Sequence, residues 1–202
     1  MDAFNLLKAD HRKVEELFSK LENASGQAKL RVFEQIKTEL ELHTHIEEKI
    51  FYPALEKPKQ THELTLEAYE EHDVVKKLLR ELSRAKSPTE EWEAQAKVLQ
   101  ENVEHHVEEE ENELFKKAQA ALSEEDIEAL GEQMEAEKER KQRTAGKASS
   151  KKKSGAANKS ASKSKSASTA AKRARTSKSG SKSSGSKRQS KKSTKSTKKS
   201  RR

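Results

Sequence analysis

The feature that most constrains this sequence is a set of four amphipathic stripes, each with the three- or four-residue spacing of one helix face and each containing a histidine. In one stripe His43 and Glu47 stand four residues apart among apolar side chains, so they lie one above the other on the buried face. His106 and Glu110 repeat this arrangement in a second stripe. The stripes and their histidines are 7–21 with His11, 33–54 with His43, 68–82 with His72, and 92–114 with His106.

The histidines and carboxylates on these stripes predict a metal centre. A buried carboxylate without a partner is costly or takes up a proton, and the stripes offer no lysine or arginine to pair with Glu47 and Glu110. A cation is the simplest partner, and imidazole with carboxylate suits iron, zinc or manganese. One histidine on an apolar face is more often a core residue, but four with two carboxylates favour a metal site. The candidate ligands are His11, His43, Glu47, His72, His106 and Glu110.

The turn signals between the stripes predict an all-α fold. The expected helices occupy residues 2–24, 27–56, 61–85 and 88–121. Ser87 should cap the fourth of them, and Ser123 caps a shorter fifth helix that ends near Arg140. The connections are short, so consecutive helices should be antiparallel neighbours in an up-down-up-down four-helix bundle. Consecutive histidines lie about 14 to 19 residues from the turn between them, which places all four at roughly one level.

The three other histidines, His45, His62 and His105, lie on polar faces or at a helix start. Their neighbours at helical spacing are charged residues rather than apolar ones. We therefore expect these three side chains to face solvent.

Charge divides the chain into two domains. Residues 1–140 contain 20 Lys and Arg against 35 Asp and Glu, a net charge of −15, whereas residues 141–202 contain 23 Lys and Arg and no acid. The second part consists mainly of Lys, Ser, Ala and Thr without an aromatic residue, so it cannot bury a core and is expected to be disordered. We predict a metal-binding bundle over 1–140 and a basic tail over 141–202.

The basic tail predicts an interaction with nucleic acid. Dense positive charge without aromatic residues favours sequence-independent binding to phosphates by counterion release, and it offers no platform for stacking bases. Two alternatives stay open: a solubilising tail that lies back on the acidic domain, and binding to an anionic membrane surface. The candidate nucleic-acid-binding residues are Lys151, Lys152, Lys153, Lys172, Arg173, Arg175, Lys187, Arg188, Lys191, Lys192, Lys198, Lys199, Arg201 and Arg202.

Several classes of protein are disfavoured by what the sequence lacks. The chain contains no cysteine, which excludes disulfides and thiolate ligands. No serine nucleophile stands in a recognisable hydrolase motif. The N-terminal residues lack the basic and apolar regions of a secretory signal, and no apolar run approaches the roughly 20 residues of a membrane span. We expect a cytoplasmic protein associated with the nucleoid through its tail, or a nuclear one in a eukaryote.

Four short motifs surround the candidate ligands. They are Asp10-His11-Arg12, His43-x-x-x-Glu47-Glu48 before Ile50-Phe51-Tyr52-Pro53, Glu71-His72, and His106-x-x-x-Glu110-Glu111 before Leu114-Phe115. Over residues 1 to about 135 the chain thereby resembles the hemerythrin-like, or HHE cation-binding, domain. The resemblance implies a four-helix bundle with a non-haem di-iron centre. It implies that one iron is held by His11 and His43, the other by His72 and His106, and that the bridging carboxylates are Glu47 and Glu110.

Two positions depart from the oxygen-carrying hemerythrins. Those proteins have a second histidine four residues after the one in the third helix, where this chain has Lys76; water, Tyr69 or Glu71 could replace that ligand. Their last carboxylate lies five residues after its histidine, which points to Glu111, whereas ideal helix geometry favours Glu110. The Glu-x-x-His pattern of ferritin-type di-iron bundles is absent from this sequence.

The resemblance implies a protein that binds dioxygen, nitric oxide or peroxide rather than a conventional enzyme. Carriage, sensing and turnover stay open, and zinc or manganese would suit the same side chains. The tail resembles the lysine-rich tails of linker histones and of some bacterial histone-like proteins. Two hypotheses follow. The first is a hemerythrin-like di-iron protein tethered to DNA by its tail; the second is a nucleoid-associated DNA-binding protein whose metal-stabilised bundle has no redox role.

Overall fold

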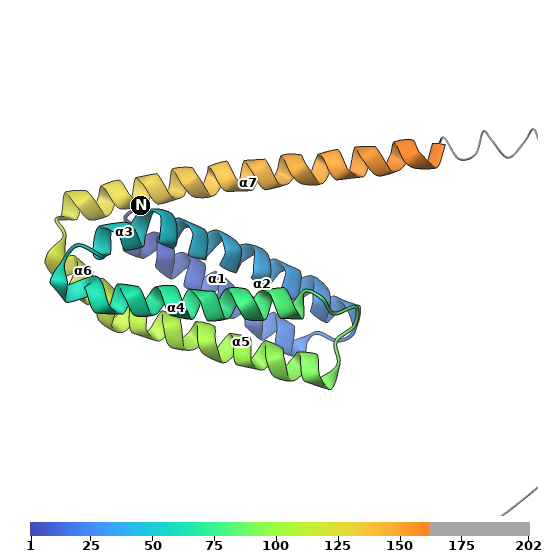
Figure 1. Cartoon of the computed structure of the whole chain (residues 1–202), viewed down its shortest axis with the longest axis horizontal. Helices are drawn as coiled ribbons and strands as arrows, with labels where there is room; N and C mark the ends of the chain where they lie inside the picture. Colours follow the sequence, from blue (N-terminus) through green and yellow to red (C-terminus); the bar gives the residue numbers. More distant parts are fainter. Residues whose placement is uncertain (162–202) are drawn as a thin grey trace, which may run out of the picture. The chain divides into compact units, whose positions relative to one another are not determined.

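The structure, a computed structural model, describes the backbone of residues 1–161 and the side chains of residues 1–144 (Figure 1). The described residues are helical with short connections and contain no strand. Two turns, η1 and η2, are π-helical. In chain order the elements are α1 Ala3–Asn23, α2 Gln27–Ile46, η1 Glu47–Phe51, α3 Tyr52–Leu55, α4 Lys59–Leu82, α5 Glu90–Glu109, η2 Glu110–Leu114, α6 Phe115–Ala121 and α7 Glu124–Ala161.

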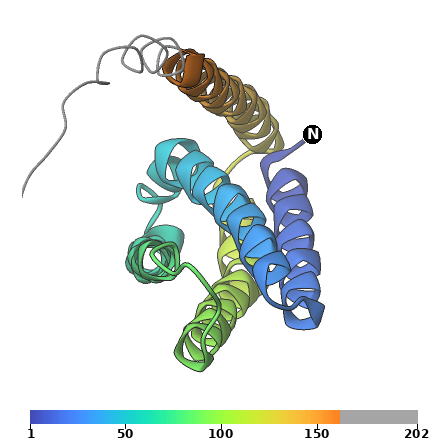
Figure 2. The ribbon, with the colours of Figure 1, turned by 90° about the vertical axis from the view of Figure 1, so that its right-hand side faces the viewer.

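The first four long helices form an antiparallel bundle, as the sequence predicted. α1 packs mainly against α2, and α4 packs mainly against α5; the arrangement is visible end-on in Figure 2. Two apolar clusters fill the interior. One contains Phe18, Phe33 and Trp92, and the other contains Phe51 and Phe115. The candidate metal ligands lie along the helices between the residues of these two clusters, so packed side chains enclose them from both ends.

Of the two expected helix caps, the one at Ser123 is confirmed, and Asp2 caps the first helix. The backbone N–H of Asn5 donates to Oδ1 of Asp2 at 2.9 Å, which caps α1, and the N–H of Asp126 donates to Oγ of Ser123 at 3.1 Å, which caps α7. The expected cap of the fourth helix was wrong. Thr89, not Ser87, caps α5: its backbone is extended and its Oγ1 accepts from the N–H of Trp92 at 3.2 Å. Three glutamates then occupy the first turn, where they complement the positive end of the helix.

The π-helical turn η1 shifts the buried face of its helix by one residue. A 3.6-residue period places Ile50 and Ala54 on the core stripe beyond Glu47, but both are only half-buried. Phe51 and Leu55 are fully buried in their place. In η1 the N–H of Tyr52 bonds to the carbonyl of Glu47, five residues back, so the turn contains one extra residue.

Helix α7 is much longer than expected. The expected end near Arg140 was wrong, because the helix continues to Ala161. The composition argument ruled out a packed core, but a single helix needs none, and Ala, Lys and Arg have high helix propensity.

Gly131 allows α7 to lie against the start of the chain, because a Cβ there would collide with the backbone of residues 1–3.

Residues 1–153 and 154–202 form two units. The first contains the four-helix bundle and the part of α7 that packs on it. Among the described residues, no helix has the length and apolar composition needed to cross a membrane.

Candidate metal centre

The structure brings all six predicted ligands together inside the bundle. Every one of these side chains is buried, and Glu47 is fully so. Their donor atoms form two groups, within each of which the atoms lie no more than 4.8 Å apart. The first group is His11, His43, Glu47 and Glu110; the second is Glu47, His72 and His106. Glu47 therefore belongs to both groups, and the two groups form one extended constellation.

The Nε2 atoms of the histidines point toward the buried carboxylates. Around Glu47, the Nε2 of His43 lies 3.1 Å and that of His72 3.4 Å from Oε2. Around Glu110, the Nε2 of His11 lies 3.5 Å and that of His106 3.9 Å from Oε2. Each carboxylate thus faces histidines from two different helices, an arrangement that a bridging ligand between two cations requires.

A second set of carboxylates holds the histidines from outside. On three of the four rings the Nδ1 atom hydrogen-bonds to an acidic side chain, and on the fourth it faces one at a longer distance. The pairs are His11 with Glu111 at 2.7 Å, His106 with Glu71 at 2.7 Å, His72 with Glu48 at 3.0 Å, and His43 with Asp10 at 3.8 Å. Such outer carboxylates fix the ring orientation and leave Nε2 free for a metal.

These pairings show where the residues that the sequence left open lie. Glu110 lies in the inner constellation, and Glu111 contacts it only through His11. Glu71 likewise holds His106 from outside. The sequence analysis missed this role for Glu48 and Asp10. A signal existed, because all four outer carboxylates stand directly beside an inner residue in the acidic doublets and Asp-His or Glu-His pairs quoted above.

A buried tyrosine that the sequence did not single out reaches the centre. The hydroxyl of Tyr52 donates to Oε1 of Glu110 at 3.0 Å and lies 3.2 Å from Nε2 of His72. Tyr69, the expected alternative, instead donates to Oε1 of Glu56 at 2.9 Å and does not enter the constellation. Lys76 also stays outside, where its Nζ lies 2.5 Å from Oε1 of Glu48.

The two inner carboxylates have opposite pKa shifts. Burial, followed by the charge of Glu110, raises the pKa of Glu47 well above its usual range. Burial acts in the same direction on Glu110, but His106 and His11 outweigh it and hold its pKa well below the usual range. Within this pair, burial and mutual repulsion thus favour a proton on Glu47 and the ionised form of Glu110.

Three of the inner histidines, His11, His43 and His106, also have shifted pKa values. Burial lowers the pKa of His43 to about 4, so its ring is neutral near pH 7. Burial lowers the pKa of His11 and His106 too, but the nearby Glu110 outweighs it and raises both above the ordinary histidine value. The pKa is thus lowered for His43 and raised for His11 and His106, because the three rings lie at different positions relative to the buried carboxylates.

The residues present fit a bound metal ion. Both oxygens of Glu47, Oε2 of Glu110 and Nε2 of His11 are buried without a hydrogen-bond partner. Unpartnered buried polar atoms are rare because each one costs free energy. Cations placed among them would satisfy these atoms and neutralise the paired carboxylates, and imidazole with carboxylate is a donor set that iron, zinc and manganese accept.

An apolar cavity adjoins the histidines. It has a volume of about 10 Å³, room for one water-sized molecule, and its walls combine the four inner histidines with residues such as Val14, Leu40 and Val75. A larger groove of about 480 Å³ lies outside it between α1 and α5. His11, Val14 and Val103 line both spaces, so the groove adjoins the cavity.

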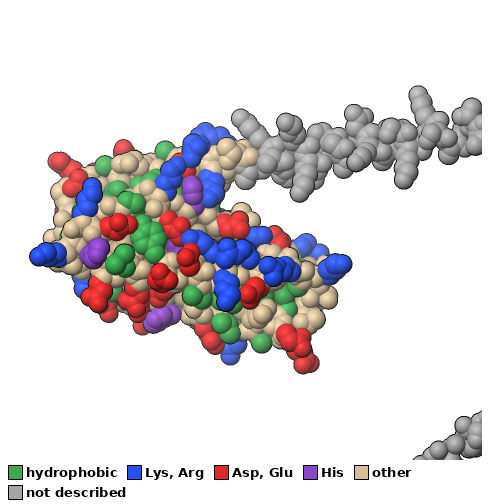
Figure 3. Space-filling model, in the orientation of Figure 1, with side chains coloured by type: hydrophobic (Ala, Val, Ile, Leu, Met, Phe, Trp, Pro, Cys, Tyr) green, Lys and Arg blue, Asp and Glu red, His purple; other side chains and the backbone are tan. Residues whose placement is uncertain are grey.

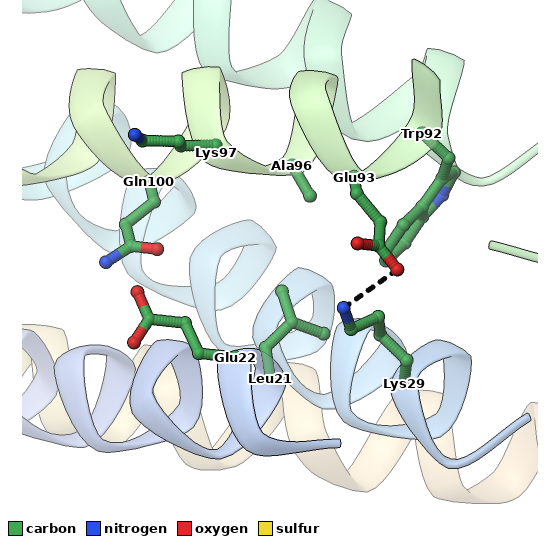
Figure 4. Close-up of a pocket in the computed structure, with 8 residues that line it drawn as sticks. All are labelled: Leu21, Glu22, Lys29, Trp92, Glu93, Ala96, Lys97 and Gln100. Carbon is green, nitrogen blue, oxygen red and sulfur yellow. Dashed lines mark ion pairs between the residues drawn. The ribbon is translucent and has the colours of Figure 1, made fainter. Parts of the chain in front are cut away.

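A second surface hollow lies away from the histidines, where α1, α2 and α5 meet. Its volume is about 240 Å³, and it contains the ion pair between Lys29 and Glu93 at 2.9 Å beside Trp92 (Figure 4). Its lining residues include no histidine, so it does not offer the donor set of the buried centre.

The three remaining histidines were expected to face solvent. His62 and His105 do so. His45 does not: its side chain is 29% exposed, and its Nε2 lies 2.7 Å from Oε1 of Glu137 on α7. The expectation was wrong because it treated the bundle alone, and α7 covers this polar face.

The comparisons with known proteins agree with this geometry. A sequence profile of the hemerythrin HHE cation-binding domain matches residues 2–118. The chain belongs to this family. It is a hemerythrin-like metal-binding protein.

Two similar proteins illustrate the relationship. A hemerythrin HHE cation-binding domain-containing protein from Mycobacterium kansasii, solved as a crystal structure, is 26% identical with a TM-score of 0.60; the match covers 69% of this chain and 86% of that one. A DNA nickase from Nostoc sp. is 29% identical over 150 residues, which are 73% of this chain. The match spans only 42% of the nickase, so less than half of that protein is represented here.

The predicted nucleic-acid-binding residues lie outside the part of the chain whose side chains are described. Lys151, Lys152 and Lys153 fall within the backbone of α7, and the other eleven, from Lys172 to Arg202, lie beyond its last residue, Ala161. Their role therefore stays a prediction from composition.

Proposed function

We propose that this protein is a hemerythrin-like di-iron protein that binds dioxygen, nitric oxide or peroxide. The observation that carries the proposal is the sharing of Glu47 between two sets of metal-ligating atoms. One cation would be held by His11 and His43, the second by His72 and His106, with Glu47 and Glu110 contributing to both. The family membership supports cation binding, and the nitrogen and oxygen donor set is one that iron accepts, as zinc and manganese do.

The protein's own groups would restrict what reaches the centre. The apolar cavity beside the histidines admits a molecule about the size of water, which favours a diatomic or similarly small ligand. Iron, when bound, supplies an open coordination position and a change of oxidation state. The hydroxyl of buried Tyr52 lies beside the inner carboxylates, where it donates a hydrogen bond to Glu110 and helps to exclude bulk water. Oxygen carriers have a second histidine four residues after the one in the third helix, and this chain has Lys76 at that position. The absence of that second histidine beside His72 favours sensing or stress response over oxygen carriage.

We also propose that the basic tail associates the protein with DNA. The 23 positive residues of 141–202, without a single acid, support binding to phosphates. The similarity to a protein named DNA nickase adds weak support for a nucleic-acid context. The tail contains no feature that would recognise a base sequence, so the binding should be independent of sequence. DNA binding would place the protein at the nucleoid in the cytoplasm.

A second candidate function gives the metal no redox role. In that case the bundle is a structural module, and DNA association is the main activity. The tail charge and the nickase relative favour this alternative as much as the first. The two differ in whether the centre, once filled, reacts with a small ligand.

The deciding experiment is metal analysis followed by ligand titration. Freshly purified protein should contain about two iron per chain, and nitric oxide added without oxygen should change its visible spectrum. His43→Ala combined with His106→Ala should abolish both signals while leaving DNA binding unchanged. Zinc or no metal after anaerobic iron loading would reject the di-iron function and leave the DNA-binding alternative.

The tail is tested separately with truncated protein. Full-length protein should bind duplex DNA of any sequence, with an affinity that falls steeply as salt rises. A chain ending at residue 161 should lose most of this affinity. Equal affinities of the two forms would reject the role of the tail without affecting the metal centre.

A further inference from the structure

A second group of metal-ligating side chains lies on the surface next to the buried centre. Its members, Glu71, His105 and Glu109, offer donor atoms within 4.8 Å of one another. The Nε2 of His105 lies 3.3 Å from Oε1 of Glu109 and 3.9 Å from Oε1 of Glu71. His105 is 63% exposed, whereas the two glutamates are partly buried. A hydrated cation can therefore reach this group directly from solvent.

Glu71 connects this surface group with the buried centre. Its Oε1 faces His105, while its Oε2 accepts a hydrogen bond from Nδ1 of His106 at 2.7 Å. A narrow crevice with room for about one water-sized particle continues inward from Glu71 and Glu109 to His106 and Glu110. Glu110, one of the buried residues that line this crevice, has an Oε2 atom without a hydrogen-bond partner. Oxygen and nitrogen donors thus follow one another from the surface to the interior.

Glu71 and Glu109 differ in their charged neighbours from two other outer carboxylates of the centre. Those two carboxylates form ion pairs with lysines: Glu48 with Lys76, and Asp10 with Lys138. Among the described residues, no lysine or arginine forms an ion pair with Glu71 or Glu109.

Further carboxylates surround the group instead. Glu67 and Glu113 lie close enough to Glu109 to repel its charge. Figure 3 shows acidic side chains gathered over the parts of α4 and α5 near the bundle end that leads into α6. Such a concentration of negative charge attracts cations and raises their local concentration.

We propose that Glu71, His105 and Glu109 form a capture site for a hydrated divalent cation on its way to the buried centre. The donor set of one imidazole and two carboxylates suits Fe²⁺, Mn²⁺, Co²⁺ or Zn²⁺. A buried metal centre needs a path by which the ion arrives, and this corner combines accessible ligands, negative charge and a crevice. The inference rests on the buried cation centre proposed above, and its test distinguishes failure of one from failure of the other.

The test measures the rate at which Co²⁺ fills the metal-free full-length protein, followed by the cobalt absorbance in a stopped-flow instrument. The variants are His105→Ala and Glu109→Gln, which change exposed or partly exposed side chains that, among the described residues, form no hydrogen bond or ion pair with an inner ligand. Glu71 is left unchanged because it orients His106. The controls are His62→Ala, another exposed histidine, and Glu113→Gln, which removes the same charge from a residue outside the group.

Both test variants should slow loading at least about tenfold at low Co²⁺, while the controls stay within about twofold of the unmodified protein. The final amount of Co²⁺ per chain should be the same in all five proteins. In protein whose centre is already filled, one further weakly bound Mn²⁺ should be detectable by electron paramagnetic resonance and should be lost in Glu109→Gln.

Three outcomes would overturn the proposal. Equal loading rates would show that ions enter elsewhere. A lower final Co²⁺ content in the two variants would make the group a resident site rather than a transit site. Failure of every form to take up Co²⁺ would remove the buried centre itself, and with it the proposed function and the need for a capture site.

Discussion

The hydroxyl of Tyr52 donates a hydrogen bond to Oε1 of Glu110 across the interior of the bundle, at 3.0 Å. Both side chains are buried, and they belong to different helical segments, α3 and η2. Burial and then the charge of Glu110 raise the pKa of Tyr52 well above its usual value, so the hydroxyl keeps its proton and remains a donor. One carboxylate of the centre is thereby oriented by a residue that is not an acid or a histidine.

Replacing Tyr52 by Phe should test this hydrogen bond. We expect the free energy of unfolding of the metal-free protein to fall by about 1 to 2 kcal/mol, because Oε1 of Glu110 loses its donor while the ring keeps its packing. Urea unfolding measures the change. Tyr69→Phe is the matched control, since its hydroxyl bonds to exposed Glu56 and its loss should cost less than about 0.5 kcal/mol. Equal losses in the two variants would contradict the special position of Tyr52.

Replacing Glu47 by Gln should separate stability from metal binding. Burial and Glu110 raise the pKa of Glu47, so in the metal-free protein a neutral amide should be tolerated as well as or better than the carboxyl group. Metal binding should suffer instead, because Glu47 belongs to both ligand groups. We expect the metal-free variant to unfold at the same or a higher urea concentration, with at most about one metal per chain. A variant that still binds two metals would show that Glu47 is not shared.

Metal affinity should fall as the solution becomes more acidic. The pKa values of His11 and His106 are raised, so in the metal-free protein these rings hold protons at a higher pH than ordinary histidines do. A metal must displace those protons, and each one makes the affinity fall by about tenfold per pH unit below the raised pKa. Titrations with Co²⁺ at about pH 8, 7 and 6 should show progressive weakening. An affinity that is constant over this range would contradict the assignment of these histidines as ligands.

Removing Lys138 should loosen the packing of α7. Its ammonium group forms an ion pair with Asp10, whose carboxylate also faces Nδ1 of His43. In Lys138→Met, the partly buried Asp10 loses that partner, and we expect a loss of about 1 to 3 kcal/mol of unfolding free energy. Arg143→Met is the control because its ion pair with Glu139 is exposed and should contribute less than about 0.5 kcal/mol. The comparison is made by urea unfolding of both variants, and no difference between them would mean that α7 packs without this pair.

The sequence determined the bundle and the six inner residues. The spacing of apolar residues fixes which side of each helix is buried, and His43 and Glu47, four apart on such a side, had to enter the core together. Short connections made consecutive helices antiparallel, which brought the four histidines to one level. These properties are local, because a helix has a fixed period and rise, and they can be read without knowing what packs against what.

Tertiary structure decided the features that depend on how the helices rotate and where they touch. The π-helical turn after Glu47 inserts one residue, which buries Phe51 in place of Ile50 and brings Tyr52 to the centre; no regular period predicts it. The outer carboxylate of each histidine comes from a different helical segment, as Glu71 does for His106, so the pairs exist only after packing. The contact of His45 with α7 likewise depends on where α7 packs on the bundle, which the spacing of residues around His45 does not reveal. Local periodicity therefore determines which histidines and glutamates enter the interior, whereas packing between segments determines their orientation, their hydrogen-bond partners and their access to solvent.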